Sequence, residues 1–164
     1  MRKPGFATSL LASGRHPGEV ADVARVDAMR QLSPARRAEL GQYMTPAAVA
    51  SFMASLLRTD AAEVRLLDAG AGVGALTAAA VEAFAGRPAR PTSITVDAWE
   101  VDPTLARYLR ETLTACEEHG AAAGLRVEAR VHVENFIASG VGALDGGLFA
   151  TQRGAFNAAI LNPP

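Results

Sequence analysis

The chain has 164 residues, nearly half of them apolar, which is enough for one domain with its own hydrophobic core. Its net charge is −1: residues 1–41 carry seven basic and four acidic side chains, and residues 42–164 carry nine and thirteen. This balance argues against a strongly nucleic-acid-binding surface. No apolar run is long enough to span a membrane, and the single cysteine, Cys116, excludes a disulfide within the chain, so we expect a cytoplasmic α/β protein.

The first 40 residues are predicted to form a helical arm. Residues 1–17 include the apolar patch FATSLLA, which is too short and too interrupted for a signal peptide. A weak helical pattern follows over residues 18–31, and Ser33-Pro34 is typical of the beginning of another short helix. The excess of basic groups in this arm is compatible either with nucleic-acid binding or with a solvated charged helix.

The next helix is predicted to begin at Thr45-Pro46, with Thr45 as its N-cap. Five apolar residues behind it share one helical face, which we expect to be buried: Val49, Phe52, Met53, Leu56 and Leu57. The period then changes at VRLLD, residues 64–68, a short apolar run that predicts a buried parallel strand.

Helices and strands alternate over the rest of the chain. The predicted elements are a helix over 74–84, strands over 93–100, 125–133 and 156–161, and a helix from Asp102-Pro103 to about residue 119. This alternation predicts a doubly wound parallel sheet. In such sheets ligands bind beyond the carboxyl ends of the strands.

A glycine-rich turn follows the first strand: Gly70, Gly72 and Gly74 alternate with small residues, and Asp68 stands two positions before Gly70. A dinucleotide site has the spacing G-x-G-x-x-G and binds a pyrophosphate, which an acid at this place would repel. The turn here instead suits a ligand that carries positive charge. A simple tight turn is the alternative interpretation.

Glu100 ends the second predicted strand, where a carboxylate can accept hydrogen bonds from both hydroxyls of a ribose. The alternative is an acid that caps the next helix, but Asp102 already fills that place. After the third strand, Asn135 could bond the edge of an adenine and Phe136 could pack on its face. A turn asparagine beside a core phenylalanine explains this pair equally well.

The chain closes with Asn162-Pro163-Pro164 after the fourth strand. Prolines fix the backbone and lack N–H groups, so the Asn162 side-chain oxygen and the Pro163 carbonyl form a rigid pair of acceptors. Such a pair suits an amino group, because it holds both hydrogens and leaves the nitrogen lone pair free.

In this order, the stretches GQYMTP, LDAGAGVG, WEVDP, ENF and NPP resemble the adenine-N6 DNA methyltransferases of restriction–modification systems. The resemblance covers Gly41 to Pro164. It implies a Rossmann-like fold that depends on S-adenosylmethionine, with residues 41–164 as a partial methyltransferase catalytic domain. We expect an N-terminal fragment, truncated after the fourth strand and inactive alone, that lacks the C-terminal half and the target-recognition domain.

The resemblance also implies roles for single residues. The residues implied to bind the donor, S-adenosylmethionine, are Tyr43, Thr45, Pro46, Asp68, Gly70, Gly72, Glu100, Val101, Asn135 and Phe136. Thr45 would lie near the carboxylate of the donor's methionine and Asp68 near its amino group, while Glu100 would hold the ribose hydroxyls. Val101 would pack on the adenine of the donor. Asn135 is neutral where the family favours an acid, from which we expect weaker donor binding.

On the substrate side, the resemblance implies that Asn162, Pro163 and Pro164 are catalytic and grip the amino group of an adenine flipped out of double-stranded DNA. In-line transfer would then need no metal, and no histidine has the spacing of a metal ligand. A restriction or specificity subunit would be a partner. The alternatives are methylation of a protein glutamine or an RNA amino group, and a catalytically incomplete donor-binding fragment.

Overall fold

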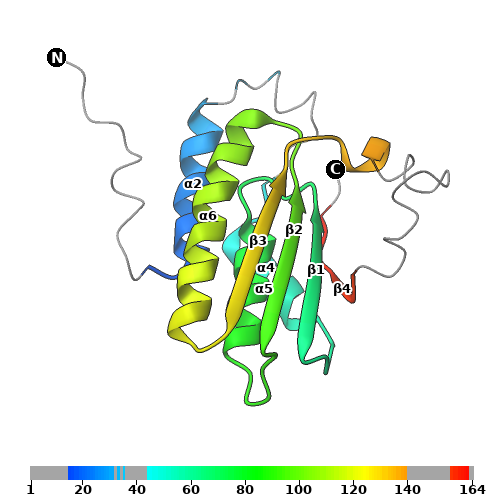
Figure 1. Ribbon diagram of the computed structural model, residues 1–164. Coiled ribbons are helices and arrows are strands. Elements are labelled where there is room, and N and C mark those ends of the chain that lie inside the picture. The colour runs from blue at the N-terminus through cyan, green and yellow to red at the C-terminus, as the bar shows by residue number, and fades with distance from the viewer. Residues whose placement is uncertain (1–14, 32, 34, 36–43, 140–155, 163–164) are drawn as a thin grey trace.

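The computed structural model describes residues 15–31, 33, 35, 44–139 and 156–162, which form a parallel sheet flanked by helices (Figure 1). The elements are α2 (Pro17–Gln31), α4 (Ala47–Ser55), β1 (Glu63–Ala69), α5 (Ala75–Ala85), β2 (Ser93–Trp99), α6 (Pro103–Ala122), β3 (Arg126–His132) and β4 (Ala158–Ala159). The strand order is β3-β2-β1-β4 and every pair is parallel, which confirms the predicted parallel, Rossmann-like α/β sheet. The short helix predicted at Ser33-Pro34 falls mostly outside the described residues.

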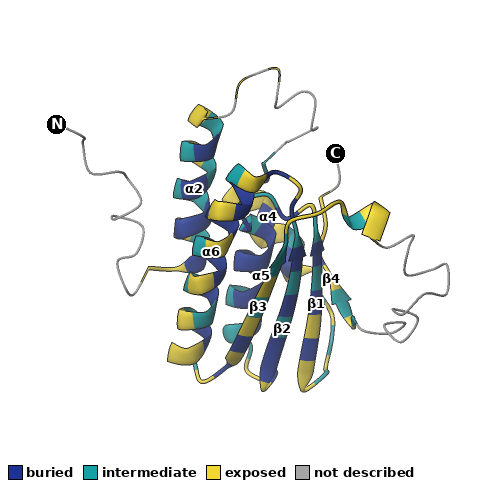
Figure 2. Ribbon diagram, turned by 45° about the horizontal axis from the view of Figure 1, so that its top comes forward, coloured by how far each residue is buried: buried dark blue, intermediate teal, exposed yellow. Residues whose placement is uncertain are grey.

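The labelled helices lie on one side of the sheet (Figures 1 and 2). Strands β1 and β2 pair in register, Leu66 with Val96 and Asp68 with Ala98, and these alternate positions are the buried ones. The residues between them, such as Arg65 and Asp97, point to the other face and are more accessible. Period-two burial of this kind is what a sheet covered on one face produces.

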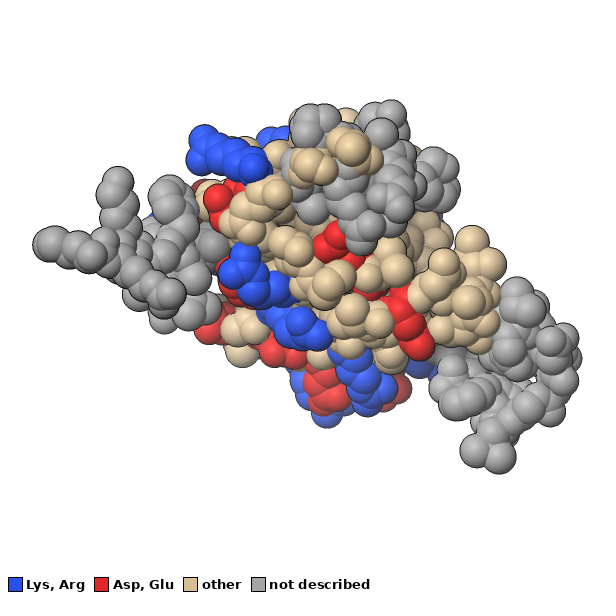
Figure 3. All heavy atoms as spheres, turned by 90° about the horizontal axis from the view of Figure 1, so that it is seen from above, with Lys and Arg blue, Asp and Glu red and all other residues tan. Residues whose placement is uncertain are grey.

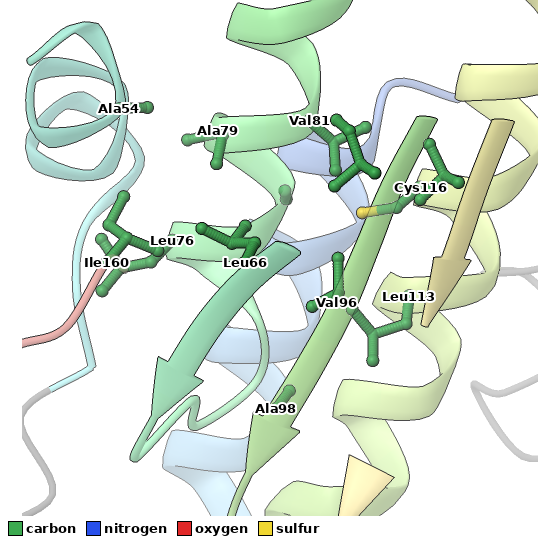
Figure 4. Packing of buried hydrophobic residues seen from close by; sticks show 14 of the residues in the cluster. Ala54, Leu66, Leu76, Ala79, Val81, Val96, Ala98, Leu113, Cys116 and Ile160 are labelled. Atoms are coloured by element: carbon green, nitrogen blue, oxygen red, sulfur yellow. The ribbon is translucent and has the colours of Figure 1, made fainter. Parts of the chain in front are cut away.

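The core lies between the sheet and helices α5 and α6. Figure 4 shows Leu66 of β1 near Leu76 of α5, and Val96 of β2 beside Leu113 of α6. Burying a large side chain of this kind contributes about 1.5–3 kcal/mol. The inward face predicted for α6 is confirmed, since each of its members is buried: Leu105, Tyr108, Leu109, Leu113 and Cys116.

The predicted start of α6 is confirmed as well. Asp102 is its N-cap, and one carboxylate oxygen accepts hydrogen bonds from the N–H groups of Thr104 (2.7 Å) and Leu105 (3.3 Å). Pro103 occupies the first turn, where its missing N–H costs nothing. The motif is local, so the sequence alone predicts it.

The predicted start of α4 is wrong by one residue. Pro46 is the N-cap, and no side chain of the described residues caps the helix; the Thr45 hydroxyl accepts a hydrogen bond from Asn162 instead. The predicted buried face is wrong for three of its five residues, because Val49, Phe52 and Leu56 are 46%, 63% and 57% exposed. Met53 and Leu57 are half-buried and pack against the core, as predicted.

Alanines form the buried face of α4 instead. Ala50 and Ala54 are buried, and Ala54 faces Ala79 of α5 (Figure 4). Small residues at a contact let two helices approach closely, and Met53 and Leu57 pack at the edge of this contact. Hydrophobic periodicity does not distinguish small apolar side chains from large ones, so it does not predict that the alanines are the buried residues.

Strand β4 is shorter than the predicted 156–161. Only Ala158 and Ala159 pair with β1. The Asn157 amide extends the contact by accepting from Arg65 N–H and donating to the Glu63 carbonyl, both at 2.8 Å. This side chain lengthens a backbone ladder in which Asn157 N–H donates to the Arg65 carbonyl at 3.1 Å and Ile160 N–H donates to the Leu67 carbonyl at 2.9 Å. No helix in the described ranges has the length and apolar character needed to cross a bilayer.

Candidate functional site

A cavity of about 370 Å³ opens at the carboxyl ends of the strands. This is the place that an open parallel sheet offers to a ligand. The lining includes the loop after β1, the end of β2, the turn after β3 and the segment after β4: Met44, Thr45, Ala69, Gly70, Ala71, Gly72, Val73, Ala75, Leu76, Trp99, Glu100, Val101, Leu105, Glu134, Asn135, Phe136, Ile137, Leu161 and Asn162. The tertiary structure thus gathers the strand-end residues of all four predicted strands around one space.

The loop after β1 owes its path to three glycines. Gly70, Gly72 and Gly74 have φ of +79°, +58° and +88°, in the left-handed region that favours glycine. A Cβ on Gly70 or Gly72 would meet nothing within 4 Å, whereas one on Gly74 would lie 2.9 Å from Leu109 Cδ1. The first two glycines therefore leave open space beside the cavity, and the third permits α5 to pack closely on α6.

Glu100 ties two sides of the cavity together. It is 5% exposed, and its Oε2 accepts from Gly72 N–H at 2.9 Å while its Oε1 accepts from Asp102 N–H at 2.8 Å. Burial raises the pKa of Glu100, and these two N–H groups oppose the shift. Each carboxylate oxygen has a second lone pair, so the group still has acceptor capacity toward a ligand in the cavity.

Asp68 is not among the described residues that line the cavity, and its predicted contact with the amino group of a donor stays a prediction. It is fully buried beneath the glycine loop, where Oδ2 accepts from the Thr77 hydroxyl of α5 at 2.6 Å. Its Oδ1 has no hydrogen-bond partner within the described part of the chain, and burial raises the pKa of Asp68 to about 7. The side chain points to the inner face of the sheet because it alternates with Leu67, and the sequence run could not reveal which face that was.

Asn135 lines the cavity and also makes a local hydrogen bond that is typical of an asparagine in a turn. Its Oδ1 accepts from Ala138 N–H at 3.1 Å at the start of the short helix 136–139. Phe136 is half-buried, and Val101 is 50% exposed at the cavity wall. Asn135 therefore makes the hydrogen bond expected of a turn asparagine, its oxygen retains a second lone pair, and its predicted contact with an adenine stays a prediction.

Trp99 is a lining residue that the sequence prediction missed. Its indole stacks on His132 with 4.1 Å between ring centroids and meets Phe136 edge-on at 5.2 Å. Its Nε1–H donates to Glu134 at 3.3 Å, and His132 Nε2 lies 2.8 Å from Asp97 Oδ1. The signal available in the sequence was that the only tryptophan directly precedes Glu100.

Asn162 reaches the cavity from the segment after β4. Its Nδ2 donates to the Thr45 hydroxyl at 3.1 Å, and both residues line the cavity. Pro46 caps α4 and does not line it. Tyr43, Pro163 and Pro164 lie outside the described residues, so their predicted roles stay predictions.

Among the residues that the structure describes, the charged side chains that line the cavity are Glu100 and Glu134, both acidic. Figure 3, seen from above the strand ends, shows acidic side chains toward the middle of this face and a run of basic side chains to one side of them. Within the same residues, no group of three His, Cys, Asp or Glu side chains could hold a metal ion. The electrostatics of the cavity thus favour a cationic or dipolar organic ligand.

Comparison with known proteins adds to the geometry. No model of a known protein family matches the chain. The chain is 33% identical over 143 residues to Type II methyltransferase M.PstI of Providencia stuartii, covering 87% of this chain and 27% of that protein. It is 31% identical over 131 residues to Type II methyltransferase M.BsuBI of Bacillus subtilis, covering 78% and 25%. The chain therefore spans about a quarter of the length of these relatives.

Proposed function

Because the chain is homologous to part of two Type II methyltransferases, we propose that the protein transfers a methyl group from S-adenosylmethionine to adenine N6 in DNA, as part of a restriction–modification system. One observation carries the proposal: Glu100 and the Asn162 amide line the same cavity. Glu100 is suited to a ribose and the Asn162 amide to an amino group, so a methyl donor and the amino group that receives the methyl could meet in this cavity. We further propose a cytoplasmic location and a restriction or specificity subunit as a partner.

The donor side of the cavity fits S-adenosylmethionine. Its volume, about 370 Å³, lies within the usual range for small-molecule sites, and the charged side chains among its described lining residues are acidic, which suits the positive charge of a sulfonium. Glu100 would accept hydrogen bonds from the ribose hydroxyls. Gly70 and Gly72 have no side chains and would let the protein backbone approach the donor closely, and Phe136 would flank the adenine of the donor. When bound, the donor supplies a methyl group that is already electrophilic.

Asn162 carries the proposed chemistry on the target side. Its Oδ1 would accept a hydrogen from the target amino group, and the Pro163 carbonyl is proposed to accept the other. Holding both hydrogens directs the nitrogen lone pair at the methyl group, so the alignment of the reacting atoms would account for most of the catalytic effect. The proton that the amino group loses passes to water, and the adenine must leave the base stack to reach this depth.

The test uses the protein expressed from its complete gene. We would incubate it with methyl-labelled S-adenosylmethionine and unmethylated double-stranded DNA, digest the DNA and separate the nucleosides. Label in N6-methyladenine is the expected result, and an Asn162→Ala variant should abolish the label while still binding the donor. Label in a methylated cytosine would overturn the adenine assignment. Intact donor binding without label in DNA would favour an RNA or protein amino group.

A further inference from the structure

Thr45 and Asn162 meet although 117 residues separate them in the chain. Thr45 is 8% exposed and Asn162 is exposed at the cavity, and the Asn162 Nδ2 donates to the Thr45 Oγ1 at 3.1 Å. The contact joins the segment before α4 to the segment after β4, which is held in place by the pairing of β4 with β1.

An asparagine amide has one donor end and one acceptor end of nearly the same shape. Only the oxygen can accept a hydrogen from a target amino group; the NH2 end would present donors to donors. Rotation by half a turn about the last side-chain torsion exchanges the two ends at little steric cost. Whatever group determines this orientation therefore determines whether Asn162 can work.

The Thr45 hydroxyl can set the orientation only if its own proton is committed elsewhere. A hydroxyl both donates and accepts, so a free one would tolerate either end of the amide. None of the described residues accepts the Thr45 proton. An acceptor on a ligand in the cavity would remove this freedom, because the oxygen could then only accept from Asn162 Nδ2.

Thr45 stands on a rigid support. The Pro46 carbonyl that follows it accepts from Ala50 N–H at 3.0 Å, and Ala50 is buried in the core. Threonine is branched at Cβ, which restricts its first side-chain torsion. The hydroxyl is consequently held in place relative to both the cavity and Asn162.

We propose that Thr45 is a positioning residue that links donor binding to the target amino group. Its hydroxyl donates to the carboxylate of the bound donor and accepts from Asn162 Nδ2, which turns Asn162 Oδ1 toward the target. The proposal rests on the proposed methyl transfer and deepens it. A donor-bound protein is thereby the one in which the amide faces the correct way.

Two substitutions in the protein expressed from its complete gene test this role. Thr45→Val keeps the shape but removes the hydroxyl, and Thr45→Ser keeps the hydroxyl. At saturating donor and DNA we expect kcat of T45V to fall at least about tenfold and kcat of T45S to stay within about threefold of the parent. Calorimetry with S-adenosylhomocysteine and thermal unfolding would accompany the kinetics, and Thr45→Ala replaces T45V if that variant does not fold.

The outcomes separate the two proposals. If the parent methylates DNA and T45V loses activity that saturating donor fully restores, Thr45 is a donor ligand only and the positioning role is overturned. If kcat of T45V stays within threefold of the parent, the role is likewise overturned. If T45S loses as much kcat as T45V, shape rather than the hydroxyl matters and the role also fails. A parent that binds donor without methylating DNA contradicts the proposed function itself.

Discussion

The carboxylate of Glu100 accepts a hydrogen bond from Gly72 N–H at 2.9 Å and so fastens the glycine loop of β1 to the end of β2. The same loop is held a second time by the Trp99 carbonyl, which accepts from Gly70 and Ala71 N–H at 2.9 and 2.8 Å. The wall of the cavity is therefore built by contacts between neighbouring strand ends. Its shape depends on residues about 30 positions apart.

Replacing Glu100 with alanine should weaken donor binding more than about tenfold, since the variant loses hydrogen bonds to a charged acceptor and frees the glycine loop. Calorimetry with S-adenosylhomocysteine measures this directly. Quenching of Trp99, the only tryptophan of the chain, gives a second readout from the cavity wall. Glu128→Ala is the matched control, because Glu128 is an exposed acid of β3 away from the cavity. Equal affinities for the two variants would contradict a ribose-binding role.

Asp68 should make the free energy of unfolding depend on pH. Its pKa is raised from 3.8 to about 7, so the folded state holds the proton more tightly than the unfolded state does. The stability from this group is complete below about pH 4 and is lost as the pH rises through 7. Asp68→Asn should therefore be more stable than the parent at pH 8, on the order of 2–4 kcal/mol, and should differ little at pH 4.

Urea unfolding at several pH values tests the Asp68 effect. Asp60→Asn is the control, because Asp60 is an exposed carboxylate whose substitution should leave the pH profile of the parent intact. A D68N profile parallel to that of the parent would show that the buried carboxyl does not titrate in this range. The amide can still accept the hydrogen bond from Thr77, so packing is largely preserved.

Alanine substitutions at Gly74 and Gly70 form a matched pair that tests the packing of the glycine loop. Both have positive φ, so alanine should cost about 1 kcal/mol of backbone strain at either position. At Gly74 the new Cβ would also lie 2.9 Å from Leu109 and 3.1 Å from Thr112, which adds about 1–3 kcal/mol of overpacking. Chemical denaturation should rank G74A as the less stable variant, and equal stabilities would refute the close contact between α5 and α6.

The buried face of α4 can be tested by exchanging volumes. Phe52→Gln should change the free energy of unfolding by no more than about 0.5 kcal/mol, because the ring is 63% exposed. Ala54→Leu should destabilise by about 1–3 kcal/mol or more, since Ala54 is fully buried against α5. If Phe52→Gln destabilised the protein more than Ala54→Leu, the buried face predicted from hydrophobic periodicity would be the correct one.

What the sequence determined by itself is the set of features with local causes. The Asp102 cap, the left-handed glycines after β1 and the inward face of α6 all follow from residues within one or two turns of each other. The alternation of helix and strand predicts the parallel sheet, and the sheet places every strand end at one edge. These features are decided by backbone sterics and by short-range hydrogen bonds.

Only the tertiary structure decided which faces and which distant partners are used. The packed side of α4 depends on the alanines that α5 presents, and the burial of Asp68 depends on which face of β1 the helices cover. The bond between Asn162 and Thr45 joins segments that no local pattern relates. Burial and long-range hydrogen bonds are properties of the assembled packing, so a single stretch of sequence carries too little information to specify them.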